Sequence, residues 1–175
     1  MLRQPESGNR QPSGFTLIEI LVVMVILGVL AAALTLAVGG SGGERRLARE
    51  AEQTQALLGF ACEQAELTGR EIGVSINISG YRFSHLERDT WETFAGGELR
   101  PRKWSSGGSA ALSRDGHPVE ITPQYPDKPQ LLCFSSGELT PFRLDLGLGD
   151  VPRRYRLDGQ PDGTVRLVAV DTRVR

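Results

Sequence analysis

The sequence has little of the chemistry that marks an enzyme. Its 175 residues include two histidines, His85 and His117. His117 precedes Pro118 in a segment of glycine and proline, and His85 continues an alternating pattern with Tyr81 and Phe83. Neither lies in a zinc-protease, nucleophile-elbow or phosphate-loop motif. The sequence therefore predicts no enzyme, no metal site and no cofactor.

An excess of basic residues is also missing. The chain has 20 Lys+Arg against 21 Asp+Glu, a formal net charge of −1, whereas a general nucleic-acid binder usually carries a clear basic excess. The arginines that do cluster stand late in the chain: Arg153, Arg154, Arg156, Arg166, Arg173 and Arg175. They could hold phosphates or line a solvated strand face. The second interpretation is favoured because the net charge is negative and Tyr155, the only aromatic residue among these arginines, is expected to point inward instead of forming a stacking platform. Nucleic acid is therefore not an expected partner.

Cysteine is scarce, with Cys62 and Cys133 the only two. Cys62 follows Leu58 by four residues on a predicted helix face, and Cys133 lies in an apolar strand segment. An oxidising compartment would permit a disulfide between them, but cysteine is also common as a free buried residue. Sequence cannot test the required Cα separation, so both alternatives remain open.

No proline lies between Pro12 and Pro101, and a long apolar run stands near the start of this stretch. From Phe15 to Val38 the only polar side chains are Thr16, Glu19 and Thr35. About 20 residues in a helix cross a hydrocarbon core of roughly 30 Å. The run therefore predicts a transmembrane helix over residues 15–38.

A cleaved secretory signal is the rival interpretation of this run. Its positive region would hold Arg3 and Arg10, its apolar region Leu17 to Leu30, and its cleavage site Ala31 to Ala33. The apolar run exceeds the usual length of about 7–15 residues, and a signal peptide gives no reason for a carboxylate at Glu19. Flanking charges do not orient the helix, because Arg45, Arg46 and Arg49 follow it closely.

The segment Gly14-Phe15-Thr16-Leu17-Ile18-Glu19 carries the strongest motif of the chain. An acid inside a membrane span is a functional hypothesis by default. The motif resembles the type IV prepilin signature. That resemblance implies that a prepilin peptidase/methyltransferase cleaves between Gly14 and Phe15 and then N-methylates Phe15. It also implies that Glu19 pairs with the amino terminus of a neighbouring subunit. It also implies a single-pass inner-membrane protein with a cytoplasmic N-terminus and residues 1–14 as a leader.

Four glycines among residues 39–43 disfavour a continuous helix, so this segment is expected to be a hinge, or else a local unwinding with no mechanical role. Helical periodicity resumes at Glu44 and continues to Thr68, where Gly69 is expected to end it. The predicted buried face repeats at spacings of three and four: Leu47, Ala51, Thr54, Leu58, Ala61 and Ala65.

After Gly69 the apolar period changes from 3.6 to 2. A strand from Ile72 to Ile78 with one apolar face is expected to turn at Ser79-Gly80 into a second strand. Weaker strands are expected over residues 89–95 and around Val119 and Ile121. Two further hairpins are expected, one around Ser136-Gly137 and one around residues 159–163. Residues 44–175 thus predict an α+β domain, in which the helix of 44–68 packs on an antiparallel sheet within residues 70–175.

The pilin-like resemblance narrows on motifs spread over the chain: residues 44–47, 67–73, 80–83 and 134–142. They resemble the H-type minor pseudopilin of type II secretion, in the GspH/FimT grouping. The resemblance implies a β-rich pilin fold, a periplasmic domain, and a low-copy subunit near the pseudopilus tip that contacts other minor pseudopilins and the major pseudopilin. The alternative it leaves is a type IV pilus minor pilin that acts in pilus assembly or DNA uptake.

Overall fold

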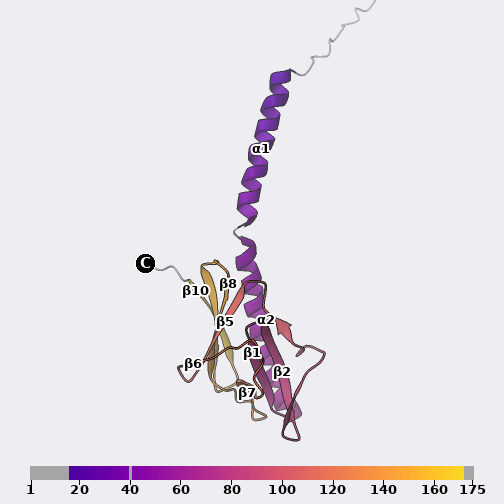
Figure 1. Cartoon of the computed structure of the whole chain (residues 1–175), viewed down its shortest axis with the longest axis vertical. Helices are drawn as coiled ribbons and strands as arrows, with labels where there is room; N and C mark the ends of the chain where they lie inside the picture. The colour runs from indigo at the N-terminus through magenta and orange to yellow at the C-terminus, as the bar shows by residue number, and fades with distance from the viewer. Residues whose placement is uncertain (1–15, 40, 172–175) are drawn as a thin grey trace, which may run out of the picture. The chain divides into compact units, whose positions relative to one another are not determined.

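The described residues of the computed structural model, 16–39 and 41–171, fall into two units (Figure 1). The first unit is Met1–Gly40, and its described helix is α1 (Leu17–Gly39). The second unit is Ser41–Arg175, which holds α2 (Ser41–Thr68) and the strands. The division between the units falls inside the glycine-rich segment 39–43.

Helix α2 begins at Ser41, so the predicted start at Glu44 is wrong, and Gly42 and Gly43 are helical. A Cβ atom at Gly43 would lie 3.0 Å from Cγ2 of Val151. Glycine therefore lets the first turn of α2 closely approach the loop before β9 (Arg153–Gly159). Glu44 also lies in this first turn, where a negative charge favours the helix dipole. These tertiary and electrostatic terms outweigh the low helix propensity of glycine.

The predicted apolar face of α2 is confirmed. The six residues of this face are each no more than 2% exposed: Leu47, Ala51, Thr54, Leu58, Ala61 and Ala65. The predicted end is also confirmed, since Gly69 has a φ of 64°. The Gly69 and Arg70 amides donate to the carbonyls of Glu66 and Ala65, which is the Schellman pattern of helix termination.

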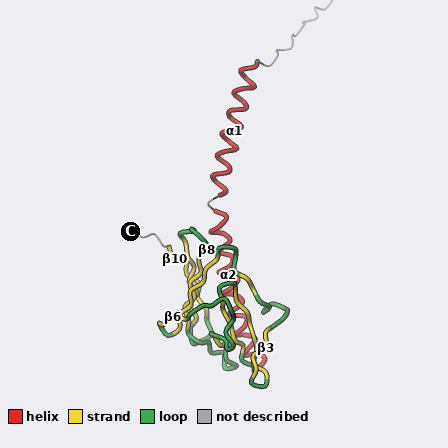
Figure 2. Tube along the Cα trace, in the orientation of Figure 1, coloured by secondary structure: helices red, strands yellow, loops and turns green. Residues whose placement is uncertain are grey.

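The strands form two antiparallel sheets instead of the single sheet predicted. The α+β class is confirmed, and Figure 2 shows the helices in red and the strands in yellow. In the first sheet β4 pairs with β2, and the other strands follow the order β3-β2-β1-β7. Its strands are β1 (Ile72–Asn77), β2 (Gly80–Glu87), β3 (Thr90–Thr93), β4 (Arg102–Lys103) and β7 (Leu131–Cys133). The second sheet has the order β10-β9-β8-β5-β6. Its strands are β5 (Gly108–Arg114), β6 (His117–Val119), β8 (Phe142–Leu148), β9 (Arg153–Gly159) and β10 (Val165–Asp171). Helix α2 contacts both sheets, so the core lies where the three meet.

The expected hairpin around Ser136-Gly137 is not a strand pair. Strand β7 pairs with β1, and β8 pairs with β5 and β9 in the other sheet. The two flanks of this turn are joined by an isolated bridge between Cys133 and Leu139 and by two backbone hydrogen bonds, from the Phe134 amide to the Glu138 carbonyl and from the Thr140 amide to the Leu132 carbonyl. The hairpin around residues 159–163 is confirmed by the pairing of β9 with β10. The sequence analysis does not predict β4 or β5, because β4 has two residues and most side chains of β5 are small, so neither gives a clear alternation.

Strand β1 is buried on both faces, contrary to the expectation of one apolar face. Residues 120–130, here called the covering segment, lie over its second face. A Cβ atom at Gly73 would lie 2.2 Å from Pro129 Cγ, and Asn77 Nδ2 donates to the Pro123 carbonyl. Arg82 of the neighbouring strand places its guanidinium 4.5 Å from the centre of the Tyr125 ring. The polar residues of β1 are therefore contacts for the covering segment and not a solvated face.

The first turn also differs by one residue from the expected Ser79-Gly80. Strand β1 ends at Asn77, whose side-chain oxygen accepts the Ser79 amide at 2.9 Å, as in an Asx turn. Ile78 is 55% exposed in this turn. Gly80 belongs to β2, where a Cβ atom would lie 1.9 Å from the Arg102 carbonyl oxygen. It therefore serves close strand packing rather than the turn.

Gln130 anchors the covering segment to β1. Its side chain donates to the Ile76 carbonyl at 3.1 Å and accepts the Ile76 amide at 2.6 Å. We expect Gln130→Ala to lower the free energy of unfolding by about 1–3 kcal/mol, because both buried backbone groups lose their partner. Urea unfolding measures this. Gln124→Ala, an exposed position of the same segment, should change stability little, and equal stability of the two variants would refute the anchoring role.

Candidate functional site

Glu19, at the start of α1, is the only predicted site residue near the amino terminus that lies within the described residues. Thr16 precedes the helix, and the Glu19 amide donates to Thr16 Oγ1 at 3.3 Å and to its carbonyl at 3.1 Å. This is the N-cap arrangement, with an acid at the third helical position as in a capping box. The Thr-x-x-Glu spacing was the signal for it, and the sequence reading missed this structural role. Gly14 and Phe15 lie outside the described residues.

Glu19 is exposed in the first turn of α1, and within residues 16–39 and 41–171 no ion pair involves it. A carboxylate at this position benefits from the helix dipole and is free to accept hydrogen bonds from an amine. The local structure thus presents Glu19 outward instead of using it inside its own unit.

From Leu17 to Leu30, helix α1 exposes large apolar side chains on every side. The most exposed are Leu17 at 84%, Ile18 at 69% and Met24 at 67%. A helix that is apolar all round requires an apolar environment on all faces. Within the described part of the chain, no helix meets the combined length and hydropathy criteria for crossing a membrane.

Cys62 and Cys133 form a disulfide, with their Cα atoms 4.8 Å apart. Of the two alternatives left open by the sequence, the structure has the bonded one. Both residues are buried, at 5% and 0% exposure. The bond connects α2 to β7, and so ties the helix to the edge strand of the first sheet.

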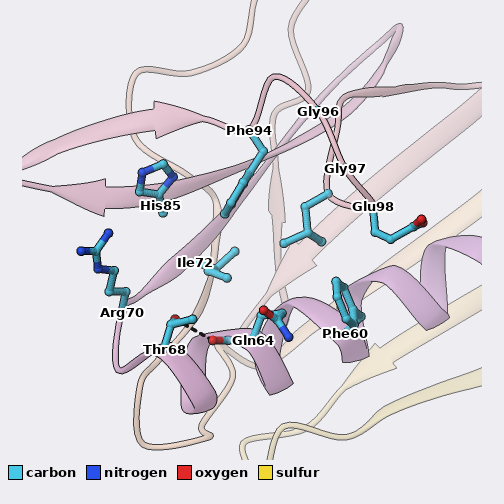
Figure 3. Close-up of a pocket in the computed structure, with 11 residues that line it drawn as sticks. Phe60, Gln64, Thr68, Arg70, Ile72, His85, Phe94, Gly96, Gly97 and Glu98 are labelled. Carbon is cyan, nitrogen blue, oxygen red and sulfur yellow. Dashed lines mark hydrogen bonds between the residues drawn. The ribbon is translucent and has the colours of Figure 1, made fainter.

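A groove of about 640 Å³ opens beside the carboxyl-terminal half of α2 (Figure 3). Phe60, Gln64 and Thr68 of α2 face His85 and Phe94 across it. His85 and Phe94 pack with ring centroids 4.9 Å apart. The sequence reading placed His85 on a strand face, which is confirmed, but it gave no sign of a groove, because the lining residues come from distant segments.

The comparisons with known proteins decide the family. The model for the prokaryotic N-terminal methylation motif matches residues 9–35, which include Gly14, Phe15 and Glu19. The chain is 35% identical over 147 residues to the type II secretion system protein H of Pseudomonas aeruginosa, across 78% of this chain and 84% of the relative. It is 32% identical over 180 residues to protein H of Aeromonas hydrophila, across 91% of this chain and 95% of the relative. The chain belongs to the type II secretion system protein H family.

The fold agrees with this membership. The minor pseudopilin EpsH from the type 2 secretion system of Vibrio cholerae matches with a TM-score of 0.59 and 26% sequence identity. The match covers 71% of this chain and 97% of the EpsH chain. The expected pilin-like α+β fold and the role of a minor pseudopilin are therefore confirmed for this protein H family member.

Two arginines of the late cluster, Arg153 and Arg156, form ion pairs across the second sheet, as does Arg143 of β8. The nitrogen-to-oxygen distances are 3.0, 3.2 and 2.8 Å in the pairs Arg143–Asp158, Arg153–Asp171 and Arg156–Asp145. The hydrogen bond to Asp145 raises the pKa of the Arg156 guanidinium above its ordinary value. Arg154 is exposed, whereas Leu157, which follows Arg156, is fully buried, so the predicted solvated strand face is confirmed. Arg173 and Arg175 lie outside the described residues.

Proposed function

We propose that this protein H family member is synthesised as a prepilin-like precursor. Prepilin peptidase cleaves between Gly14 and Phe15, and the new amino terminus at Phe15 is N-methylated. The match of the methylation motif to residues 9–35 supports this. Residues 1–14 would then be the leader, which contains Arg3, Arg10 and Glu6.

Residues 15–38 are proposed to anchor the mature chain in the inner membrane, with the N-terminus cytoplasmic and the domain of residues 44–175 periplasmic. The apolar sequence from Phe15 to Val38 supports the anchor, and the family supports the orientation. We place the proposed joint between anchor and domain before Gly42, because Gly42 and Gly43 belong to α2.

Assembly into the pseudopilus is proposed to depend on Glu19. The main support is the position of Glu19, which is exposed in the first turn of α1 and lies four residues after Phe15. From Leu17 to Leu30, the apolar side chains of this helix are exposed on all sides. In a filament these helices would cover one another, and Glu19 would accept the charged amino terminus of the next subunit. A carboxylate and an amine both lose hydration in such a core, so each needs the other.

The partners that fit this role are the other minor pseudopilins and the major pseudopilin shaft, with this chain near the filament tip. Its role is structural rather than catalytic. The pseudopilus that contains this subunit would be required for the export of folded exoproteins across the outer membrane.

The processing step is tested by intact-mass and N-terminal mass spectrometry of membrane-associated protein. Mature chain should begin at N-methyl-Phe15, and Gly14→Val should leave nearly all of the chain with its leader, because the peptidase motif requires this glycine. Gly8→Val, a matched change inside the leader, should be processed normally. A start near Ala33 would instead identify ordinary signal peptidase and overturn the proposal.

A further inference from the structure

Three side chains of types that bind metal ions meet at one end of the β2–β3 hairpin, and the proposed function uses none of them. His85 and Glu87 are two residues apart on β2 and so share a sheet face. Glu92 of β3 lies directly opposite His85 in the strand register. One potential ligand atom from each of the three lies within 4.8 Å of the others.

The hairpin fixes this juxtaposition. Glu87 pairs with Thr90 across the two-residue turn Arg88-Asp89, and both turn residues have positive φ, 46° and 67°. Such turns match the twist of the flanking strands and set the register of a hairpin. Glu92 is therefore held opposite His85 by the backbone and not by the side chains themselves.

The charges of the cluster are only partly compensated. Oε2 of Glu87 lies 3.4 Å from His85 Nε2 and 3.8 Å from Arg70 Nη1. Glu92 makes no ion pair within the described residues. Two carboxylates at this spacing repel each other, and Arg70 offsets one charge. Because the Arg70 side chain is 59% exposed, its ion pair contributes little stability and can be displaced.

The His85 ring is oriented by packing. It lies against Phe94, with 4.9 Å between ring centroids, and its Nδ1 atom is buried without a hydrogen-bond partner. The side chain is 22% exposed, and its Nε2 atom lies toward Glu87. Nε2 is therefore the nitrogen that a bound ion would meet.

We propose that His85, Glu87 and Glu92 bind a divalent transition metal ion of the zinc type. One imidazole nitrogen with two carboxylates and a water is a donor set that zinc accepts, whereas calcium and magnesium prefer oxygen ligands throughout. When a metal ion binds Nε2, the imidazole proton lies on Nδ1. In most metal-binding histidines that N–H donates a hydrogen bond to a carboxylate or carbonyl oxygen, but His85 Nδ1 has no such acceptor. The affinity for zinc should accordingly be about 10–100-fold below that of a site whose histidine has this hydrogen bond. The ion would join β2 to β3 at the rim of the groove.

Calorimetric titration of ZnCl2 into the full, tag-free, chelator-treated chain in detergent tests this. We expect one zinc equivalent per chain. His85→Gln and Glu92→Gln should each weaken binding at least about tenfold. His117→Gln, which removes the only other histidine, should leave binding unchanged. Arg70→Ala should tighten binding, because a competing cation is removed from Glu87.

Thermal unfolding of each variant without metal shows whether it remains folded, and Glu92 is exposed, so Glu92→Gln should not alter the fold. Zinc should raise the unfolding temperature of the unmodified chain and of His117→Gln, but not of folded Glu92→Gln. Absence of saturable zinc binding would overturn the proposal. So would equal binding by Glu92→Gln, loss of binding in His117→Gln, or calcium binding as tight as zinc binding.

Discussion

A Glu19→Leu variant is expected to enter the membrane and lose its leader after Gly14, yet to be almost absent from assembled pseudopili. The carboxylate and the amino terminus of the adjacent subunit attract strongly in a low-dielectric core. Removing one partner of a buried pair costs about 3–5 kcal/mol, because the other charge is left uncompensated. At about 1.4 kcal/mol per tenfold change, co-assembly should fall by two orders of magnitude or more, and secretion should fall with it.

The competing account of Glu19 is that its side chain reaches the headgroup region near the helix end. In that case leucine would insert as well or better, and assembly would be normal. Co-purification of the cleaved variant with the major pseudopilin separates the two accounts. Thr35→Leu, another polar-to-leucine change in the same apolar run, is the matched control and should co-purify at the unmodified level. A Glu19→Leu chain that does the same would rule out the pairing role.

The largest expected effect on stability comes from the disulfide. Cys62→Ala with Cys133→Ala removes a crosslink between residues 71 positions apart. The loop-entropy relation gives about 4 kcal/mol for a loop of this length. The unfolding temperature should fall by roughly 10–20 °C. Alanine is chosen because both sites are buried, where a serine hydroxyl would add an unpaired polar group.

Reductant provides the control for this double variant. The unmodified chain in dithiothreitol should approach the stability of the double variant, and the variant itself should not respond to reductant. Thiol counting on denatured periplasmic material adds an independent check. Two alkylatable thiols there, or equal stability with and without the crosslink, would show that the bond does not stabilise the native protein.

The features predicted from sequence are those that nearby residues determine. The apolar spacing from Leu47 to Ala65 predicted which face of α2 is buried, and Gly69 predicted its end, because both follow from the geometry of one helix. The arrangement of strands into two sheets did not follow. The pattern predicts one hairpin from Leu131 to Ser135 and from Leu139 to Leu146, but in the structure β7 pairs with β1 and β8 pairs with β5. Pairing between distant strands leaves no local pattern.

The candidate sites divide in the same way. Gly14, Phe15 and Glu19 belong to one contiguous motif, so the sequence alone is enough to propose them as site residues. The sequence predicts His85 as a strand residue and predicts no metal site, because His85 and Glu92 come together only through the register of the β2–β3 turn. Arg88 and Asp89 form this turn with positive φ angles although neither is glycine. The sequence therefore lacks the Asn-Gly or Asp-Gly pair that usually predicts such a turn.

Deletion of the gene for this chain, followed by comparison of exoproteins in the culture medium and periplasm, tests the central claim most directly. The account predicts that exoproteins disappear from the medium and accumulate in the periplasm. Expression of the unmodified chain should restore secretion, while Gly14→Val and Glu19→Leu should not. Normal secretion in the deletion strain, with loss of twitching motility or DNA uptake instead, would contradict a role in type II secretion.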